Sequence, residues 1–210
     1  MKNSGTAEEI KEILADVKLS KEDIKLKNAD SSSGNEFSCN ALFAFLQKLK
    51  SDPRIKTAEI SGDGFINFSL AADFWHDCLR DILSGTWKPD EVKPLTPKEL
   101  ASVQKAYNRA VSVLKHGKRM FGDVSYTKAD LRLLQSEEEI KLIRKMTYSP
   151  LSLADIAELF SELWEAERGE VEMRFLSAGE KEVSLSRLAL IYALSLVITG
   201  GFSILNITVN

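Results

Sequence analysis

The sequence predicts an α+β protein with a small α+β domain over residues 1–85 and an all-helical domain over residues 98–210. Up to residue 85, helical periodicity alternates with short runs of period two, whereas beyond residue 98 the apolar pattern is helical throughout. Residues 86–97 contain three of the five prolines in the chain. This segment is therefore predicted to be a stiff linker between the two domains.

The first domain is expected to have the order α-β-α-β-β-α. Thr6 and Glu9 form a capping box that predicts the first helix, Gly62-Asp63-Gly64 fits a tight hairpin turn, and Asp73 caps the last helix. Asp52-Pro53 ends the middle helix, because the residue before proline disfavours helical geometry. The expected elements are a helix over 7–17, a strand over 22–29, a helix over 38–50, strands over 55–61 and 65–70, and a helix over 74–83.

The second domain is expected to be a small helical bundle. Thr96 and Glu99 form a capping box at its start, and Gly117 fits the end of that helix. Residues 136–139 (SEEE) cap the helix expected over 137–147. Ser149-Pro150 is expected to open a later helix, and Gly200-Gly201 to stop the last one. The expected helices cover residues 98–116, 137–147, 151–167 and 185–199.

Bulk composition favours a protein of the reducing cytoplasm. Cys39 and Cys78 are the only cysteines and are far apart, so neither a disulfide framework nor a zinc site is expected. The acidic N-terminus is unlike a targeting segment. The apolar stretch 185–198 carries Ser186, Arg187 and Ser195, which favours a buried helix over a membrane span. We expect no metal, no cofactor and no membrane partner.

Charge is unevenly distributed along a chain whose net charge is −3. Residues 102–132 hold seven Lys and Arg against two acids, a local charge of +5. Residues 150–183 hold nine acids against three basic residues, a local charge of −6. Such polarisation can present a basic face on an acidic protein, although solvated helix faces also explain charge runs.

Several separated segments resemble one known family in the right order. Residues 62–70 (GDGFINFSL) are similar to the G-P-G-F-I-N-F motif, and residues 34–40 (GNEFSCN) to the stretch that precedes a helix, in the N-terminal tRNA-binding domain of arginyl-tRNA synthetases. Residues 103–109 (VQKAYNR) resemble the opening of their C-terminal DALR anticodon-binding domain, residues 156–164 its aromatic-rich helix, and Arg187-Leu188-Ala189-Leu190 with Gly201-Phe202 its closing helix.

The resemblance implies that the chain binds tRNA at its elbow and anticodon arm, with arginine tRNA as the natural candidate. On helix 98–116, Ser102, Lys105, Arg109, Ser112 and His116 share one stripe by their spacing. By analogy the RNA-binding residues are Lys105, Arg109, Lys118 and Arg119 for phosphates, Tyr107 and Trp164 for base stacking, and Asn35 and Asn67 for the elbow. Core packing is the other explanation for Tyr107, and turn geometry for the asparagines.

Catalysis is not expected. The nucleotide-binding domain that separates the two domains in class I synthetases is absent between them, and neither a HIGH-like nor a KMSKS-like motif nor a P-loop occurs. Lys105 replaces a tyrosine and Ser161 a histidine of the family pattern, so selectivity for an arginine tRNA stays open.

Three functions are compatible with these residues. The first is a non-catalytic tRNA-binding protein, which could serve as an adaptor that presents tRNA to another enzyme. The second is a protein–protein interaction module that uses residues 150–183 and 185–199 and has a vestigial RNA surface. The third is the tRNA-binding part of an arginine–tRNA ligase whose catalytic domain is a separate chain.

Overall fold

The computed structural model describes residues 10–11, 26–28, 37–39, 46–61, 65–169, 176–177 and 179–208. The chain divides into two compact units, Met1–Trp75 and His76–Asn210. The division falls inside helix α3 (Ala72–Ser84), before the proline-rich segment that the sequence suggested as a linker.

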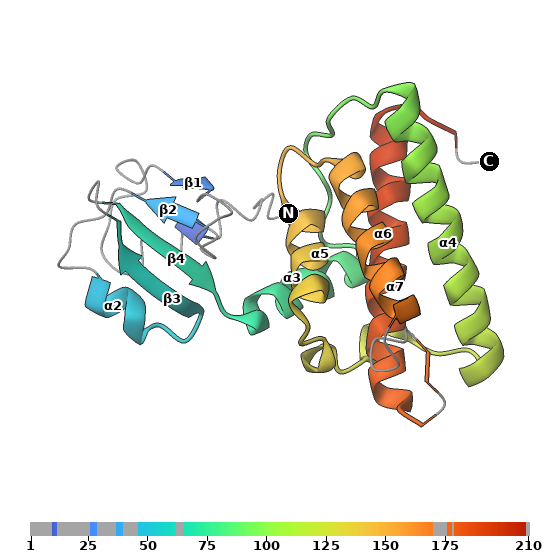
Figure 1. Ribbon diagram of the computed structural model, residues 1–210, viewed down its shortest axis with the longest axis horizontal. Coiled ribbons are helices and arrows are strands. Elements are labelled where there is room, and N and C mark those ends of the chain that lie inside the picture. Colours follow the sequence, from blue (N-terminus) through green and yellow to red (C-terminus); the bar gives the residue numbers. More distant parts are fainter. Residues whose placement is uncertain are drawn as a thin grey trace. The chain divides into compact units, whose positions relative to one another are not determined.

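The first unit contains a four-stranded antiparallel sheet with the order β1-β2-β4-β3 (Figure 1). The strands are β1 Leu26–Asn28, β2 Phe37–Cys39, β3 Ile55–Ile60 and β4 Ile66–Leu70, and helix α2 (Leu46–Ser51) packs against β3. Ile66, Phe68 and Leu70 of β4 are buried, together with Leu49 of α2. Paired strands β3 and β4 therefore carry much of the core. The turn expected at 62–64 lies outside the described residues.

The prediction of a helix over residues 38–50 is wrong in its first part. Ser38 and Cys39 belong to β2, which pairs with β4 in the register Phe37↔Phe68. Among the described residues of the expected range, the helical ones are those from Leu46 onward, in α2. A strand of three residues is too short to show a period of two, so the pairing with β4 decides its structure. Of the helix expected over 7–17, only Ile10 and Lys11 are described; both are helical and Ile10 is fully buried.

The second unit is a helical bundle arranged around α7 (Lys181–Ile204). Figure 1 shows α4, α6 and α7 side by side, and α7 also contacts α5, η3 and η4. The other elements are α4 Pro97–Phe121, η3 Tyr126–Lys128, η4 Leu131–Leu133, α5 Glu137–Thr147 and α6 Leu153–Gly169.

Helix α7 is long and apolar enough, by length and composition alone, to cross a membrane. Of the most apolar stretch of α7, however, 61% is buried inside the protein. Four consecutive residues, Leu188 to Ile191, are fully buried, so the helix is covered on every side there. Its packing is that of a core helix.

Two helices begin at the capping boxes that the sequence indicates. At α4, Thr96 Oγ1 accepts from the Glu99 backbone N–H (3.3 Å), and the Thr96 backbone N–H donates to the Glu99 carboxylate (2.7 Å). At α5, Ser136 and Glu139 make the same pair of bonds. Each reciprocal pair satisfies backbone groups that have no partner within the helix.

The glycines expected to end helices lie inside them. Helix α4 runs past Gly117 and ends at Gly122, whose φ of 78° is a left-handed value that glycine tolerates. A Cβ at Gly117 would be 2.6 Å from the Leu188 side chain, and one at Gly201 would be 2.9 Å from the Leu153 side chain. These glycines are sites of close packing between α7 and its neighbours, which local sequence does not distinguish from a cap.

Residues 86–97 are attached to the bundle. Val92 and Leu151 form an isolated parallel bridge, in which the Lys93 N–H donates to the Leu151 carbonyl and the Leu151 N–H to that of Glu91 (both 2.8 Å). Because Leu151 is extended in this bridge, α6 begins at Leu153 rather than at the expected 151.

A buried ion pair joins α5 to α7. Arg187 Nε donates to Glu139 Oε1 at 2.9 Å, and the two side chains are only 11% and 3% exposed. The second carboxylate oxygen of Glu139 accepts the Ser136 backbone N–H at 3.1 Å. One carboxylate therefore closes the capping box and compensates the arginine in the core.

Gly201→Val should destabilise the protein by about 1–3 kcal/mol, because the new side chain would overlap Leu153 in a closed core. Gly200→Ala is the matched control on the same helix, since a Cβ added there would meet nothing within 4 Å. It should be neutral or stabilising by about 0.5–1 kcal/mol. Urea unfolding measures both, and equal effects would contradict the packing role of Gly201.

Arg187→Met should destabilise the protein by about 3 kcal/mol or more, because it leaves the Glu139 carboxylate buried without this partner. The control is Lys141→Met, which removes an exposed pair with Glu137 on α5 and should cost about 0.5 kcal/mol or less. Adding Glu139→Leu to Arg187→Met should recover most of the lost free energy of unfolding. Equal costs for the two single variants would refute the importance of the buried pair.

Candidate nucleic-acid interface

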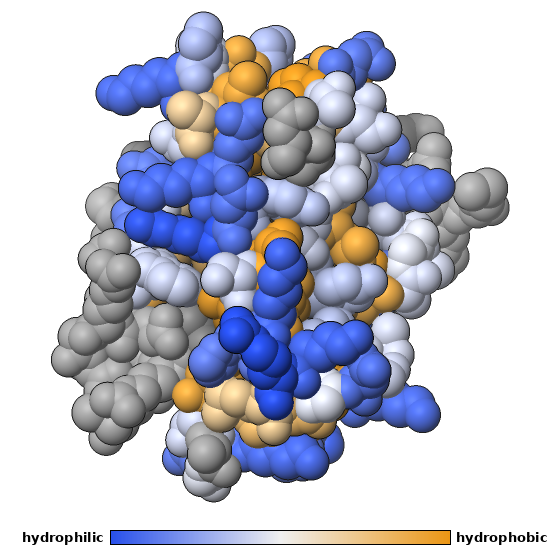
Figure 2. All heavy atoms as spheres, turned by 90° about the vertical axis from the view of Figure 1, so that its right-hand side faces the viewer, coloured by the Kyte–Doolittle hydropathy of each residue, from blue (hydrophilic) through white to orange (hydrophobic). Residues whose placement is uncertain are grey.

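Helix α4 has one buried face and one polar face. Val103, Ala106, Ala110, Val113 and Gly117 are buried, and α4 packs on α6 and α7. A polar stripe beside this face consists of residues at spacings of three and four: Ser102, Lys105, Arg109, Ser112 and His116, all exposed except the half-buried Arg109. Figure 2 views the molecule from the side of α4 and shows hydrophilic side chains gathered there.

The basic side chains of α4 extend this stripe toward the C-terminal end of the helix. Within the described ranges, Lys105, Lys115 and Arg119 form no ion pair with a carboxylate. Lys118 does, because its Nζ lies 2.6 Å from Asp123 in an exposed pair, and this hydrogen bond raises the pKa of Lys118 above its usual value. We define the basic stripe as Lys105, Arg109, Lys115 and Arg119.

Arg109 and Trp164 come together, although they are far apart in sequence. The Arg109 guanidinium lies 5.5 Å from the centroid of the Trp164 ring on α6. Trp164 in turn packs against Phe160 at a ring-centroid distance of 6.3 Å. This contact places a charged planar group and a half-buried aromatic ring at one point of the basic stripe.

The other predicted RNA-binding residues are dispersed. Tyr107 is half-buried and makes no aromatic contact within the described part of the chain. Asn67 belongs to the first unit, where it lies in β4 opposite Ser38 and Glu59 and is half-buried. Asn35 lies outside the described residues. The structure therefore brings Arg109 into contact with Trp164 and places Lys105 and Arg119 on the same helix as Arg109, whereas Asn67 belongs to the other unit.

The acidic segment is only partly described. Glu158 and Glu162 are exposed on α6, whereas Asp155 is paired with Lys145 of α5 at 2.8 Å. The hydrogen bond from Lys145 lowers the pKa of Asp155. Among the described residues no group of His, Cys, Asp and Glu side chains could hold a metal ion.

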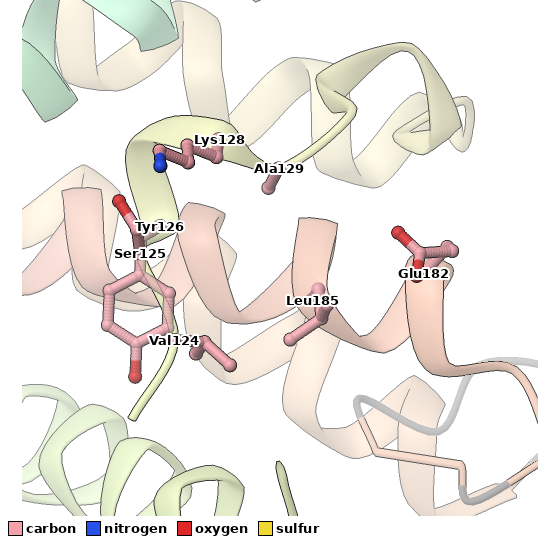
Figure 3. A pocket seen from close by; sticks show the side chains of 7 residues that line it. All are labelled: Val124, Ser125, Tyr126, Lys128, Ala129, Glu182 and Leu185. Atoms are coloured by element: carbon pink, nitrogen blue, oxygen red, sulfur yellow. The ribbon is translucent and has the colours of Figure 1, made fainter. Parts of the chain in front are cut away.

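A pocket of about 200 Å³ follows the end of α4, and sequence reasoning did not find it (Figure 3). Its lining residues come from the segment after α4 and from the first turns of α7: Val124, Ser125, Tyr126, Lys128, Ala129, Glu182 and Leu185. These two segments are far apart in sequence, so only the fold brings them together. The one signal that the sequence offers for this pocket is the excess of basic residues over 102–132, to which Lys128 belongs.

Comparison with known proteins connects the chain with one class of enzyme. The arginine–tRNA ligase of Rickettsia peacockii is 26% identical over 173 aligned residues, which cover 67% of this chain and 30% of the ligase. The arginine–tRNA ligase of Rhodospirillum rubrum is 32% identical over 127 residues, or 50% of this chain and 22% of the ligase. That of Parvibaculum lavamentivorans is 32% identical over 125 residues, or 50% of this chain and 21% of the ligase.

These similarities support a relationship with arginine–tRNA ligases. The chain spans less than a third of the length of these curated relatives. No family profile matches the chain. No solved structure matches it either.

Proposed function

We propose that this chain is a non-catalytic tRNA-binding protein related to arginine–tRNA ligases. The helical unit would act as a DALR-type anticodon-binding domain and hold the anticodon arm through the basic stripe. The first unit would bind the elbow, with Asn67 as one contact. The observation that carries the proposal is the set of exposed cations on α4 that no described carboxylate compensates.

The charges of the stripe suit a phosphate backbone. At a rise of about 1.5 Å per residue, Lys105 and Arg119 are separated by about 21 Å along α4, so one helix can contact several successive phosphates. Each neutralised phosphate releases counterions, which gives affinity that falls steeply with salt. The local positive charge explains how a protein of net charge −3 can attract RNA.

The contact of Arg109 with Trp164 adds a stacking surface to this phosphate-binding stripe. An unpaired base can stack on the exposed part of an aromatic ring or on a guanidinium plane, which is the usual way that proteins hold splayed RNA bases. Because the contact lies among the cations, a single RNA segment could engage both. This combination favours a folded RNA with unpaired bases over uniform duplex.

The double variant Lys105→Glu/Arg119→Glu should weaken binding of total tRNA at least about tenfold. It should also make the negative slope of log affinity against log salt shallower, by about 1.5. Fluorescence anisotropy across a salt series measures both quantities. The matched control is Lys88→Glu/Lys93→Glu, which makes the same charge change on exposed residues outside α4. Asp123→Asn removes the ion pair of Lys118 and should strengthen tRNA binding. Binding that is weak and unaffected by salt would refute the proposal.

The non-catalytic part of the proposal has its own test. The chain alone should not exchange pyrophosphate into ATP in the presence of arginine and tRNA, because its 210 residues contain neither of the ATP-binding motifs of class I synthetases. Radiolabelled pyrophosphate exchange measures this, with a complete arginine–tRNA ligase as the positive control. Exchange above the no-enzyme background would contradict the assignment.

A further inference from the structure

We propose that the pocket after α4 binds one guanine base. This inference goes beyond the contacts with the RNA phosphate backbone in the proposed function, and it rests on that function for the natural ligand. The pocket combines an apolar floor, an aromatic wall, one cation and one anion. A guanine nucleotide could come from an unpaired position of the bound RNA or from solution, and the base chemistry is the same in both cases.

The size and lining of the pocket suit a planar ring. A dry apolar cavity of about 150 Å³ is enough to admit benzene, and this pocket, of about 200 Å³, is open to solvent. Val124, Ala129 and Leu185 supply apolar contacts. Tyr126 forms the aromatic wall and is itself held by Tyr192, at a ring-centroid distance of 4.9 Å. Burial raises the pKa of Tyr126 above its usual value.

The two charged residues of the pocket come from different elements. Lys128 ends η3, and Glu182 lies in the first turn of α7, with its carboxylate turned toward Ala129 and Leu185 (Figure 3). Within the part of the chain that the structure describes, neither side chain forms an ion pair. A ligand that satisfies both must offer donors at one edge and acceptors at another.

Guanine has this pattern. Its N1–H and N2–H₂ groups are adjacent donors that one carboxylate can accept, whereas its O6 and N7 atoms are the acceptors that lysine and arginine commonly bind. Adenine would direct the N1 acceptor at Glu182, which is repulsive, and inosine lacks the N2 amine. The pocket should therefore prefer guanine over inosine and inosine over adenine.

The location links the pocket to the basic stripe. Gly122 ends α4, Asp123 pairs with Lys118, and Val124 is the first lining residue. An RNA strand that follows α4 past Arg119 is thus directed toward the pocket, where a flipped base could enter. This continuity favours a nucleotide of the bound RNA as the source of the guanine.

Equilibrium dialysis of the full chain with guanosine, inosine and adenosine 5′-monophosphates tests the base preference. Guanosine monophosphate should bind about tenfold more tightly than adenosine monophosphate, with inosine monophosphate between them. Glu182→Gln should remove this preference, whereas Glu180→Gln, an exposed neighbour that does not line the pocket, should retain it. Equal binding of the three nucleotides, or equal effects of the two variants, would overturn the proposal.

A second arm separates RNA from free nucleotide and separates this inference from the proposed function. Hairpin RNAs that differ only by guanine or inosine at one loop position should differ in affinity about threefold to tenfold, and Glu182→Gln should abolish the difference. RNA could bind α4 in a salt-dependent way while guanine and inosine give equal affinity at every loop position and the three free nucleotides bind equally. In that case the pocket assignment alone fails. If guanosine monophosphate is preferred but no RNA binds, the pocket stands and the proposed function fails.

Discussion

Burial of α7 is the constraint on which the helical unit depends. A helix that is apolar on all sides must be covered all round, and α4, α5 and the two short 3₁₀ turns supply that cover, together with Leu153 of α6 at Gly201. Close approach of two of these helices is possible because Gly117 and Gly201 have no side chain where Leu188 and Leu153 pack. Since the apolar face of α4 is used in this contact, its cations are directed outward. The basic stripe is thus a consequence of how the core is filled.

Polar groups inside this core make specific hydrogen bonds. Glu139 accepts from both Arg187 and the start of its own helix, and Ser186 donates to the Asp130 carbonyl at 2.8 Å. His76 Nε2 lies 2.9 Å from the Leu134 carbonyl. The bonds of Arg187, Ser186 and His76 connect segments far apart in sequence, so they help to specify one arrangement of the helices as well as contributing to stability.

Local signals predicted those parts of the fold that depend on local chemistry. The capping boxes at Thr96 and Ser136, the paired strands β3 and β4, and the helical pattern of α4 are readable from neighbouring residues. Strand β2 and the two packing glycines were misassigned, because their conformations are decided by partners distant in the sequence.

The same limit applies to the candidate site. The spacing of Lys105, Arg109 and His116 predicted the polar stripe, and in the structure Lys105 and His116 are exposed on α4 whereas Arg109 is half-buried. The contact of Arg109 with Trp164, the engagement of Lys118 by Asp123 and the pocket beside Glu182 could not be predicted, since each requires the packing of separate segments. The roles of these residues toward RNA stay predictions.

The course of α3 has a practical consequence for dissecting the chain into separately expressed pieces. The helical unit begins at His76, within α3, and Leu79 and Ile82 of that helix are buried. A fragment that starts at residue 98, the boundary suggested by the prolines, would lose these side chains together with the Val92–Leu151 bridge. A fragment that starts at Ala72 keeps all of them, so truncation of this protein should follow the helix and not the prolines.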